Sequence, residues 1–246
     1  EILYEAELPE DEDEDEGMPD YPVTVFYTRE GYFKKITPQS LRMSGEQKLK
    51  EGDEITVQME TKNNAELLFF TSKCQVYKCR VGDGKASVMG DYIAARLGME
   101  EGETPVYMAL TTDYKGHMFF LFANGKAAKV PMESYATKQN RRKLLNAFSD
   151  KSPLVYAAHL HEECELAIYT SAGRMLLVNS AQVPAKQTKN TAGVNVVTLK
   201  KNQSIIHVRR AANLELADPH RYRVRTLPAA GAILRGEDTA EQMQLL

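Results

Sequence analysis

The chain has 246 residues, of which 43% are hydrophobic, and its formal net charge at pH 7 is −3. This composition is enough to bury a substantial core and fits a single repeat-built domain better than two unrelated ones. No stretch approaches the roughly 18 apolar residues that a membrane-spanning helix needs, which argues against a membrane-embedded protein and against a membrane partner.

The charge is distributed unevenly along the chain. Of the 34 acidic residues, 11 lie in residues 1–20, which contain no Lys or Arg. Residues 21–246 therefore carry 31 basic and 23 acidic residues, a net charge of +8. A basic body indicates a polyanionic partner, because neutralising phosphates and releasing their counterions supplies most of the affinity in such complexes.

The first residue and the cysteines bear on where the protein works. The chain begins with Glu1 and has no signal peptide, so we interpret it as a C-terminal piece of a longer protein. Its three cysteines, an odd number without framework spacing, indicate free thiols in a reducing compartment. We expect a cytoplasmic location.

The first 20 residues are predicted to form an acidic linker. Residues 10–16 are seven consecutive carboxylates, which repel one another and stay extended. Residues 1–8 (EILYEAEL) alternate enough to form a short strand that pairs elsewhere, for example with the far end of the domain.

From Val23 onward the chain repeats one hairpin unit. In the first copy an apolar strand, Val23–Tyr27, leads through the turn Thr28–Gly31 into a returning strand, Tyr32–Ile36. Later copies occupy residues 67–80, 117–130 and 165–178, and the turn positions 31, 74, 125 and 173 lie 43, 51 and 48 residues apart. Glycine at three of these positions permits positive φ, whereas Cys74 at the second predicts a different type of turn.

A second strand follows each hairpin with the same period. A polar or acidic cluster precedes it, and the strand closes on Val57, Val106, Val155 and Ile206, which lie 49, 49 and 51 residues apart. After the fourth copy, residues 221–228 (RYRVRTLP) look like the first strand of a fifth unit. We therefore expect a repeat domain over residues 21–235, followed by a disordered polar tail over residues 236–246.

The fold class predicted by these landmarks is an all-β propeller or pinwheel of four recognisable repeats of about 50 residues, with a fifth, partial blade. Pairing of an N-terminal strand with that partial blade would close the ring and remove free sheet edges. The chain has no Trp and no Gly-His pair near a blade start, which argues against WD repeats, and no Gly-Gly pair, which argues against kelch repeats.

The repeats resemble the blades in the C-terminal domain of the A subunit of bacterial type IIA topoisomerases, the DNA gyrase and topoisomerase IV family. In that family a strand ending in Thr is followed by x-x-Gly, two apolar or small residues, and Lys or Arg. Residues 23–36 (VTVFYTREGYFKKI) and 67–80 (LLFFTSKCQVYKCR) match this pattern most fully, and residues 119–130 and 167–178 match it more loosely. The acidic stretch before the first repeat resembles the family's link to its catalytic core.

The resemblance implies a domain that binds and bends duplex DNA for a catalytic core in the same A subunit, which works with an ATPase B subunit. The complete enzyme would be an ATP-dependent isomerase, but its nucleophilic tyrosine belongs to the core, so we expect no catalytic residue here. Gyrase A subunits also carry a Gln-basic-Arg-Gly-Gly-basic-Gly heptapeptide in the first blade. The corresponding residues 42–48 (RMSGEQK) depart from it, as in topoisomerase IV A subunits, which leaves open whether the domain wraps DNA or only bends it.

A lysine follows the turn in three of the four copies. Lys35, Lys78 and Lys129 stand four residues after positions 31, 74 and 125, whereas the fourth copy has Leu177. Equivalent geometry predicts a basic track along the rim that holds phosphates without reading bases. The alternative is that lysines at strand ends only solvate and protect a sheet edge. The predicted DNA-binding residues are Lys34, Lys35, Arg42, Lys78, Arg80, Lys126, Lys129, Arg141, Arg142 and Arg174.

No catalytic, cofactor or metal site is predicted. His159, His161 and Cys164 are close in sequence, but no fourth ligand of suitable spacing follows, so we interpret the histidines as ordinary exposed residues. The chain has no Gly-rich phosphate loop, no G-x-S-x-G and no H-E-x-x-H motif.

The sequence therefore predicts a non-catalytic domain that holds duplex DNA on a basic outer rim through shape, not base sequence. If roughly five to eight phosphates are contacted, log affinity should fall with log salt with a slope of about −5 to −7. The main alternative is a protein-interaction propeller with no nucleic-acid role, and a propeller enzyme is a further one. The acidic run is either a passive linker or a tethered competitor for the DNA surface.

Overall fold

The computed structural model describes residues 19–44, 46–83, 90–138 and 142–243. It contains four four-stranded antiparallel sheets, called blades 1 to 4 in chain order. The predicted all-β class with four repeats is confirmed. The predicted N-terminal strand and the acidic run lie outside the described residues.

Each blade is built around one of the predicted hairpins. The hairpin strands are β1 (Pro22–Thr28) and β2 (Tyr32–Ile36), β4 (Glu66–Thr71) and β5 (Val76–Arg80), β8 (His117–Phe122) and β9 (Lys126–Pro131), and β12 (Glu165–Thr170) and β13 (Arg174–Asn179). The second predicted strand pairs with the first hairpin strand of its blade and forms one edge of the sheet. These strands are β3 (Ile55–Lys62), β7 (Pro105–Thr111), β11 (Leu154–Leu160) and β15 (Ile205–Arg210). Because β11 contacts both β7 and β15, we call this the inner edge.

The outer edge of each blade is a two-residue strand that comes from further along the chain. These strands are β6 (Asp91–Tyr92), β10 (Lys143–Leu144), β14 (Val194–Asn195) and β16 (Ala232–Ile233). In blades 1 to 3 the outer strand follows the hairpin of the next blade, so consecutive blades interlock.

Short helices connect the strands. They are α1 (Pro38–Ser44), η1 (Val81–Asp83), α2 (Ile93–Arg96), η2 (Met132–Tyr135), η3 (Ser180–Gln182), η4 (Ala211–Asn213), η5 (Pro219–Arg221) and α3 (Gly236–Met243), where η marks a 3₁₀-helix. Within the part of the chain that the structure describes, no helix has the length and apolar character needed to cross a membrane.

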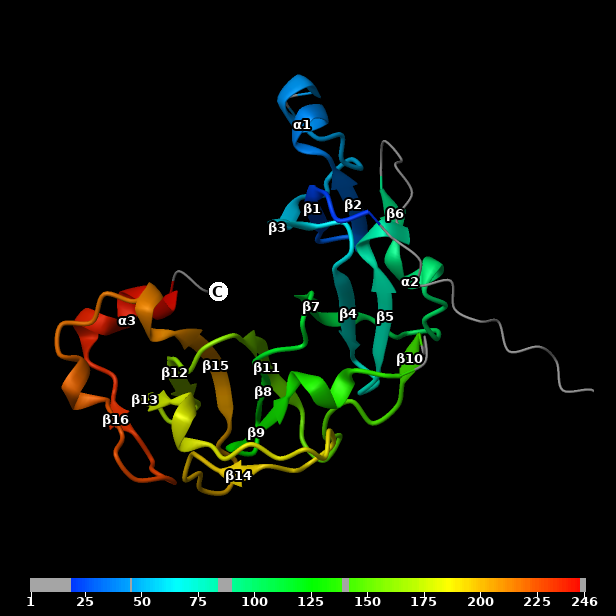
Figure 1. Cartoon of the computed structure of the whole chain (residues 1–246). Helices are drawn as coiled ribbons and strands as arrows, with labels where there is room; N and C mark the ends of the chain where they lie inside the picture. Colours follow the sequence, from blue (N-terminus) through cyan, green and yellow to red (C-terminus); the bar gives the residue numbers. More distant parts are fainter. Residues whose placement is uncertain (1–18, 45, 84–89, 139–141, 244–246) are drawn as a thin grey trace, which may run out of the picture.

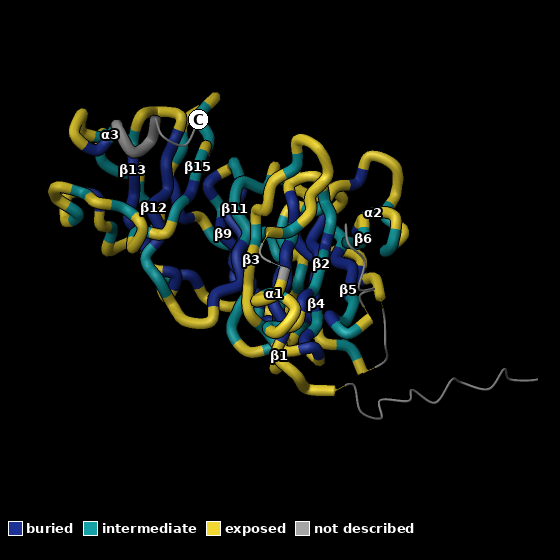
Figure 2. Tube along the Cα trace, turned by 90° about the horizontal axis from the view of Figure 1, so that it is seen from above, coloured by how far each residue is buried: buried dark blue, intermediate teal, exposed yellow. Residues whose placement is uncertain are grey.

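The hydrophobic core lies between neighbouring blades. Successive side chains of a strand point to opposite faces of its sheet. Leu67 and Phe69 therefore pack against blade 1, whereas Leu68 and Phe70 pack against blade 3. Burial on both faces explains why the hairpin strands are continuous apolar runs, and Figure 2 shows the buried residues along these strands and the exposed ones in the connecting loops.

The four hairpin turns share one geometry. In the first two, the N–H of Gly31 donates to the Thr28 carbonyl and the N–H of Cys74 donates to the Thr71 carbonyl, both at 3.0 Å. Cys74 adopts φ 56°, in the same left-handed region as the turn glycines. The prediction of a different turn type at Cys74 is therefore wrong, and a residue with Cβ takes this conformation at a cost of about 1–2 kcal/mol.

The C-terminal residues depart from the prediction of a fifth blade. The N–H of Leu177 donates to the Tyr222 carbonyl at 2.8 Å, and the N–H of Val224 donates to the Leu177 carbonyl at 3.0 Å. Residues 221–225 thus extend the outer edge of blade 4, and buried Tyr222 packs against the blade face that a fifth blade would cover. The expected disordered tail also differs, because residues 236–243 form α3, which holds the buried Asp238.

The four blades follow one another along a curved path from α1 and blade 1 to α3 (Figure 1). Among the described residues, no strand of blade 1 pairs with a strand of blade 4. The curvature places the outer edges of blades 2, 3 and 4 along the periphery, where a long partner could follow them.

Candidate nucleic-acid interface

Three lysines predicted for the rim lie between blades instead. Only 8% of Lys78 and 5% of Lys129 is exposed, and Lys35 is half-buried. The predicted outward projection of these three lysines is therefore wrong. The repeated spacing is real, but it directs each side chain into the junction with the next blade.

Each of these ammonium groups bonds to the 3₁₀-helix that follows the next blade's hairpin, and we call the three residues the inter-blade lysines. Lys35 Nζ donates to the Gly82 carbonyl at 3.0 Å, Lys78 Nζ to the Tyr135 carbonyl at 3.1 Å, and Lys129 Nζ to the Ser180 carbonyl at 3.1 Å. The side-chain acceptors are Asn63 Oδ1 at 3.0 Å, Thr137 Oγ1 at 3.2 Å and Glu163 Oε1 at 2.7 Å, in the same order.

Burial shifts the pKa values at these junctions. Desolvation lowers the pKa of Lys78, and nearby Glu66, at 3.7 Å, offsets part of that effect. At Glu163 burial alone would raise the pKa, but hydrogen bonds from Lys129 and from Ser180 bring it below its ordinary value. The lysines are thus internal structural cations.

The fourth repeat shows why the lysine belongs to the junction. Leu177 stands at the equivalent position of blade 4, where the described part of the chain contains no further blade to supply an acceptor, and it is 1% exposed. It packs with Tyr169 and Tyr222 in an apolar cluster. A lysine there would bury a charge among apolar side chains, which is costly.

The remaining predicted residues are more accessible. Arg42 and Arg142 are exposed, whereas Lys34, Arg80, Lys126 and Arg174 are half-buried. Lys126 and Arg174 are the first residues of β9 and β13, where they pair with Asn195 of β14 and Ile233 of β16. Arg141 lies outside the described residues.

The outer edges of blades 2 to 4 carry Arg142, which the sequence predicted, and further cations that the sequence analysis did not single out. The Arg142 carbonyl accepts the Lys78 N–H at 2.8 Å, and the Lys186 N–H donates to the Lys129 carbonyl at 2.8 Å, which places both residues on outer edges. The set that we call the outer-edge cations comprises Arg142, Lys186, Lys189, Arg221 and Arg225.

The excess of positive charge is concentrated in one segment of the chain. Residues 181–235 carry 10 Lys or Arg and 2 Asp or Glu, whereas the rest of residues 21–246 carries 21 of each. The whole excess of +8 therefore lies in the segment that supplies the outer strands of blades 3 and 4. This local charge count needs only the sequence, and it could have identified the outer-edge cations of blades 3 and 4.

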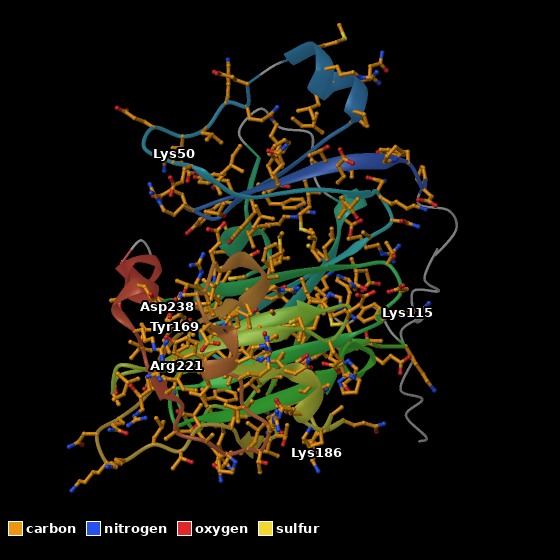
Figure 3. All side chains as sticks on the ribbon, turned by 90° about the vertical axis from the view of Figure 1, so that its left-hand side faces the viewer. Lys50, Lys115, Tyr169, Lys186, Arg221 and Asp238 are labelled. Atoms are coloured by element: carbon orange, nitrogen blue, oxygen red, sulfur yellow. The ribbon has the colours of Figure 1, made fainter. Side chains whose placement is uncertain are left out.

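The arginines of blade 4 alternate with buried residues. Tyr222 is buried and Val224 is half-buried against the blade, whereas Arg221, Arg223 and Arg225 are exposed. Arg223 is held by Glu165 through two hydrogen bonds of 2.7 and 3.1 Å. Figure 3 shows Arg221 beside Asp238 at this end of the molecule and Lys115 far from it.

The histidines form no metal centre. The rings of His159 and His161 lie 4.1 Å apart, and His159 Nε2 is hydrogen-bonded to the Lys115 carbonyl at 2.8 Å. Among the described residues, no group of three or more His, Cys, Asp or Glu is arranged to hold a metal ion. His159 is 5% exposed, so its predicted exposure is wrong.

Comparison with known proteins identifies proteins that are similar to this chain in sequence. The A subunit of DNA topoisomerase 4 from Staphylococcus aureus is 24% identical over 214 residues, covering 83% of this chain and 26% of the relative. The chain is homologous to the A subunit of DNA topoisomerase IV. The same protein from the MRSA252 strain is 25% identical over the same length. The chain thus spans about a quarter of the length of these topoisomerase IV subunits, and no protein-family model matches it.

Solved structures share the fold. The C-terminal domain of a DNA topoisomerase IV superposes with a TM-score of 0.75 at 19% identity, covering 88% of this chain and 73% of that one. The E. coli ParC C-terminal domain gives 0.69 at 15% identity, covering 88% and 95%. A DNA gyrase A C-terminal domain gives 0.54 at 14% identity, covering 86% and 76%. The predicted resemblance to the type IIA A subunits is confirmed, with the higher fold similarity to topoisomerase IV.

Proposed function

We propose that this chain is a non-catalytic DNA-binding and DNA-bending domain of a type IIA topoisomerase A subunit. The observation that carries the proposal is that residues 181–235, which supply the outer strands β14 and β16 of blades 3 and 4, carry ten Lys or Arg and only two Asp or Glu. Homology to topoisomerase IV A subunits supports it independently.

DNA would follow the curved outer surface through its phosphates. The described cations lie mostly on strands and in loops and would contact phosphates and not base edges, so recognition would depend on DNA shape and flexibility. The proposed contacts are the outer-edge cations together with Lys34, Arg42, Arg80, Lys126, Arg141 and Arg174. The inter-blade lysines are excluded because their ammonium groups are engaged between blades.

In the full-length protein, the domain would present a bent duplex to the catalytic core of the same A subunit, which acts with an ATPase B subunit. Such an enzyme would work in the cytoplasm, on the nucleoid. The departure of residues 42–48 from the gyrase heptapeptide, and the concentration of charge in blades 3 and 4, favour bending over complete wrapping.

A titration of linear duplex DNA at several salt concentrations tests the proposal. Replacing Lys186, Lys189, Arg221 and Arg225 with alanine should weaken binding at least tenfold near 0.1 M salt. The slope of log affinity against log salt should become shallower by about 3 to 4, because each lost phosphate contact removes about 0.9.

A matched control removes the same net charge elsewhere. Arg29, Lys62 and Lys73 are exposed but paired with Glu54, Asp20 and Glu100, and Lys115 lies away from the outer edge of blade 4. Alanine at these four positions should leave the salt slope nearly unchanged. Equal losses in both variants, or a wild-type affinity that does not depend on salt, would contradict the proposal.

A further inference from the structure

Helix α3 contributes a buried carboxylate beside the arginines of blade 4. Asp238 is 2% exposed, which is rare for a charged side chain unless its oxygens are hydrogen-bonded. Its Oδ2 accepts a hydrogen bond from the Tyr222 hydroxyl at 2.5 Å, and its Oδ1 accepts one from the Ala217 N–H at 3.3 Å. The carboxylate therefore ties α3 to the two ends of η5.

Tyr222 fixes the segment 221–225 to blade 4 and is itself hydrogen-bonded to Asp238. It is 1% exposed, and its hydroxyl also accepts a hydrogen bond from the Arg235 N–H at 3.1 Å. Burial, together with the hydrogen bond to Asp238, raises the pKa of Tyr222, so the phenol remains a hydrogen-bond donor at neutral pH. The Tyr222 carbonyl accepts the Leu177 N–H at the blade edge.

Fixing Tyr222 fixes the neighbouring guanidinium groups. Arg221 is the last residue of η5 and Arg223 pairs with Leu177 at the blade edge, so the position of Tyr222 between them determines where both arginines project. Arg221 is held further by a hydrogen bond from its Nη2 to the Ile233 carbonyl at 2.8 Å. Arg174 reaches the same loop from β13, where its Nη1 donates to the Gly231 carbonyl at 2.8 Å. Figure 3 shows Asp238 and Arg221 close together on this side of the molecule.

We propose that the Asp238–Tyr222 hydrogen bond is a latch through which α3 holds the Arg221–Arg225 segment in the position that binds backbone phosphates of DNA. The inference rests on the proposed DNA-binding function and adds two positioning residues, Asp238 and Tyr222, that do not touch the DNA. A pre-positioned arginine loses less conformational entropy on binding than a free one, so breaking the latch weakens the complex although no cation is removed.

The direction of the change in DNA affinity distinguishes a latch from a purely electrostatic effect of the carboxylate. Removing a carboxylate near a DNA surface reduces repulsion, so an electrostatic effect alone would strengthen binding. Replacement of the exposed Glu237 in the same helix by alanine should therefore leave DNA affinity equal or slightly higher. Asp238→Ala removes the same charge and the latch, and it should weaken binding by about three- to tenfold. Tyr222→Phe removes only the hydroxyl and should show a smaller loss in the same direction.

Two further measurements complete the test. In the Arg221→Ala/Arg223→Ala/Arg225→Ala background, Asp238→Ala should cause no additional loss of affinity, because the arginines that it positions are absent. Hydrogen exchange of residues 221–225 should be faster in Asp238→Ala than in Glu237→Ala, while the hairpin strands of blades 1 to 3 stay protected. The milder Tyr222→Phe variant serves both measurements if Asp238→Ala fails to fold.

The possible failures can be told apart. If wild-type protein does not bind DNA, the proposed function is overturned, and the hydrogen-exchange comparison still reports whether the latch orders the segment. If wild-type protein binds DNA but Asp238→Ala and Tyr222→Phe bind as tightly as Glu237→Ala, the latch is overturned and the proposed function stands.

Discussion

A buried lysine stabilises this fold only because the next blade supplies its acceptors. Lys129 illustrates the arrangement, since its ammonium lies 2.7 Å from a Glu163 oxygen and 3.1 Å from the Ser180 carbonyl. Removing one partner of such a contact leaves the others desolvated and without a hydrogen bond. The position is therefore expected to govern stability and not DNA affinity.

We expect Lys129→Ala to lower the free energy of unfolding by about 2–3 kcal/mol, because the carboxylate and carbonyl that it bridges lose their donor. Denaturant unfolding measures this loss. Lys126→Ala, three residues earlier on the same strand and half-buried at the blade edge, should change stability by no more than about 0.5 kcal/mol. A folded Lys129→Ala protein that binds DNA much more weakly than wild type would contradict the structural role.

The same contact predicts a dependence of stability on pH. The pKa of Glu163 is lower in the folded protein than its ordinary value of 4.5, so the unfolded chain takes up its proton first as the pH falls. The stabilisation by ionised Glu163 is thus present above about pH 4.5 and is lost as the pH falls through the lower folded value. Glu163→Gln should therefore be less stable than wild type at pH 6, and the difference should shrink toward pH 3 in denaturant titrations. A difference that stays constant over this range would argue against the ion pair.

At the level of elements, the last blade differs from the others because a chain segment, not a blade, covers it. Leu177 stands in an apolar cluster with Tyr222, where the preceding repeats place a lysine. Leu177→Lys should lower the free energy of unfolding by about 3 kcal/mol or more, since the ammonium finds no acceptor helix there. Leu177→Met should cost less than about 1.5 kcal/mol because volume and polarity are kept. Equal stability of the lysine and methionine variants, measured by thermal unfolding, would rule out this account.

The sequence predicted most strands because their signals are local. The hairpin strands carry continuous apolar runs around a recurring turn, and the inner strands begin after polar clusters. The outer strands β6, β10, β14 and β16 were not predicted, because each has two residues and pairs with a hairpin of the preceding repeat. Such pairing is set by tertiary structure and leaves no pattern in so short a stretch.

The candidate DNA-binding residues were predicted less well than the fold, because tertiary contacts also decide which residues reach the surface. Strand periodicity shows that Lys35, Lys78 and Lys129 occupy equivalent positions, but it does not show whether their common face meets solvent or another blade. In residues 221–225 the alternation of arginines with Tyr222 and Val224 was visible in the sequence. Its interpretation as a fifth blade was wrong because the segment docks on blade 4.

For the whole molecule, the uneven charge divides the array into two parts of different net charge. Blades 1 and 2 hold paired surface charges, such as Arg29 with Glu54 and Lys73 with Glu100, which largely neutralise one another. Blades 3 and 4 hold the excess of positive charge in residues 181–235. On the proposed function, a duplex held mainly by blades 3 and 4 would curve around this end of the array, and blades 1 and 2 would contribute fewer phosphate contacts.

This division predicts which lysines DNA protects from chemical modification. When the protein is acetylated with and without duplex DNA at about 0.05 M salt, where phosphate contacts are strong, Lys186 and Lys189 should become several-fold less reactive in the complex. Lys62 and Lys73, in blades 1 and 2, should react at nearly the same rate in both samples, and they provide the internal control. Raising the salt to about 0.5 M should abolish the protection, because the released counterions then compete for the phosphates. Uniform protection of all lysines would mean that DNA surrounds the whole array, and protection confined to blades 1 and 2 would reverse the assignment of the DNA-binding face.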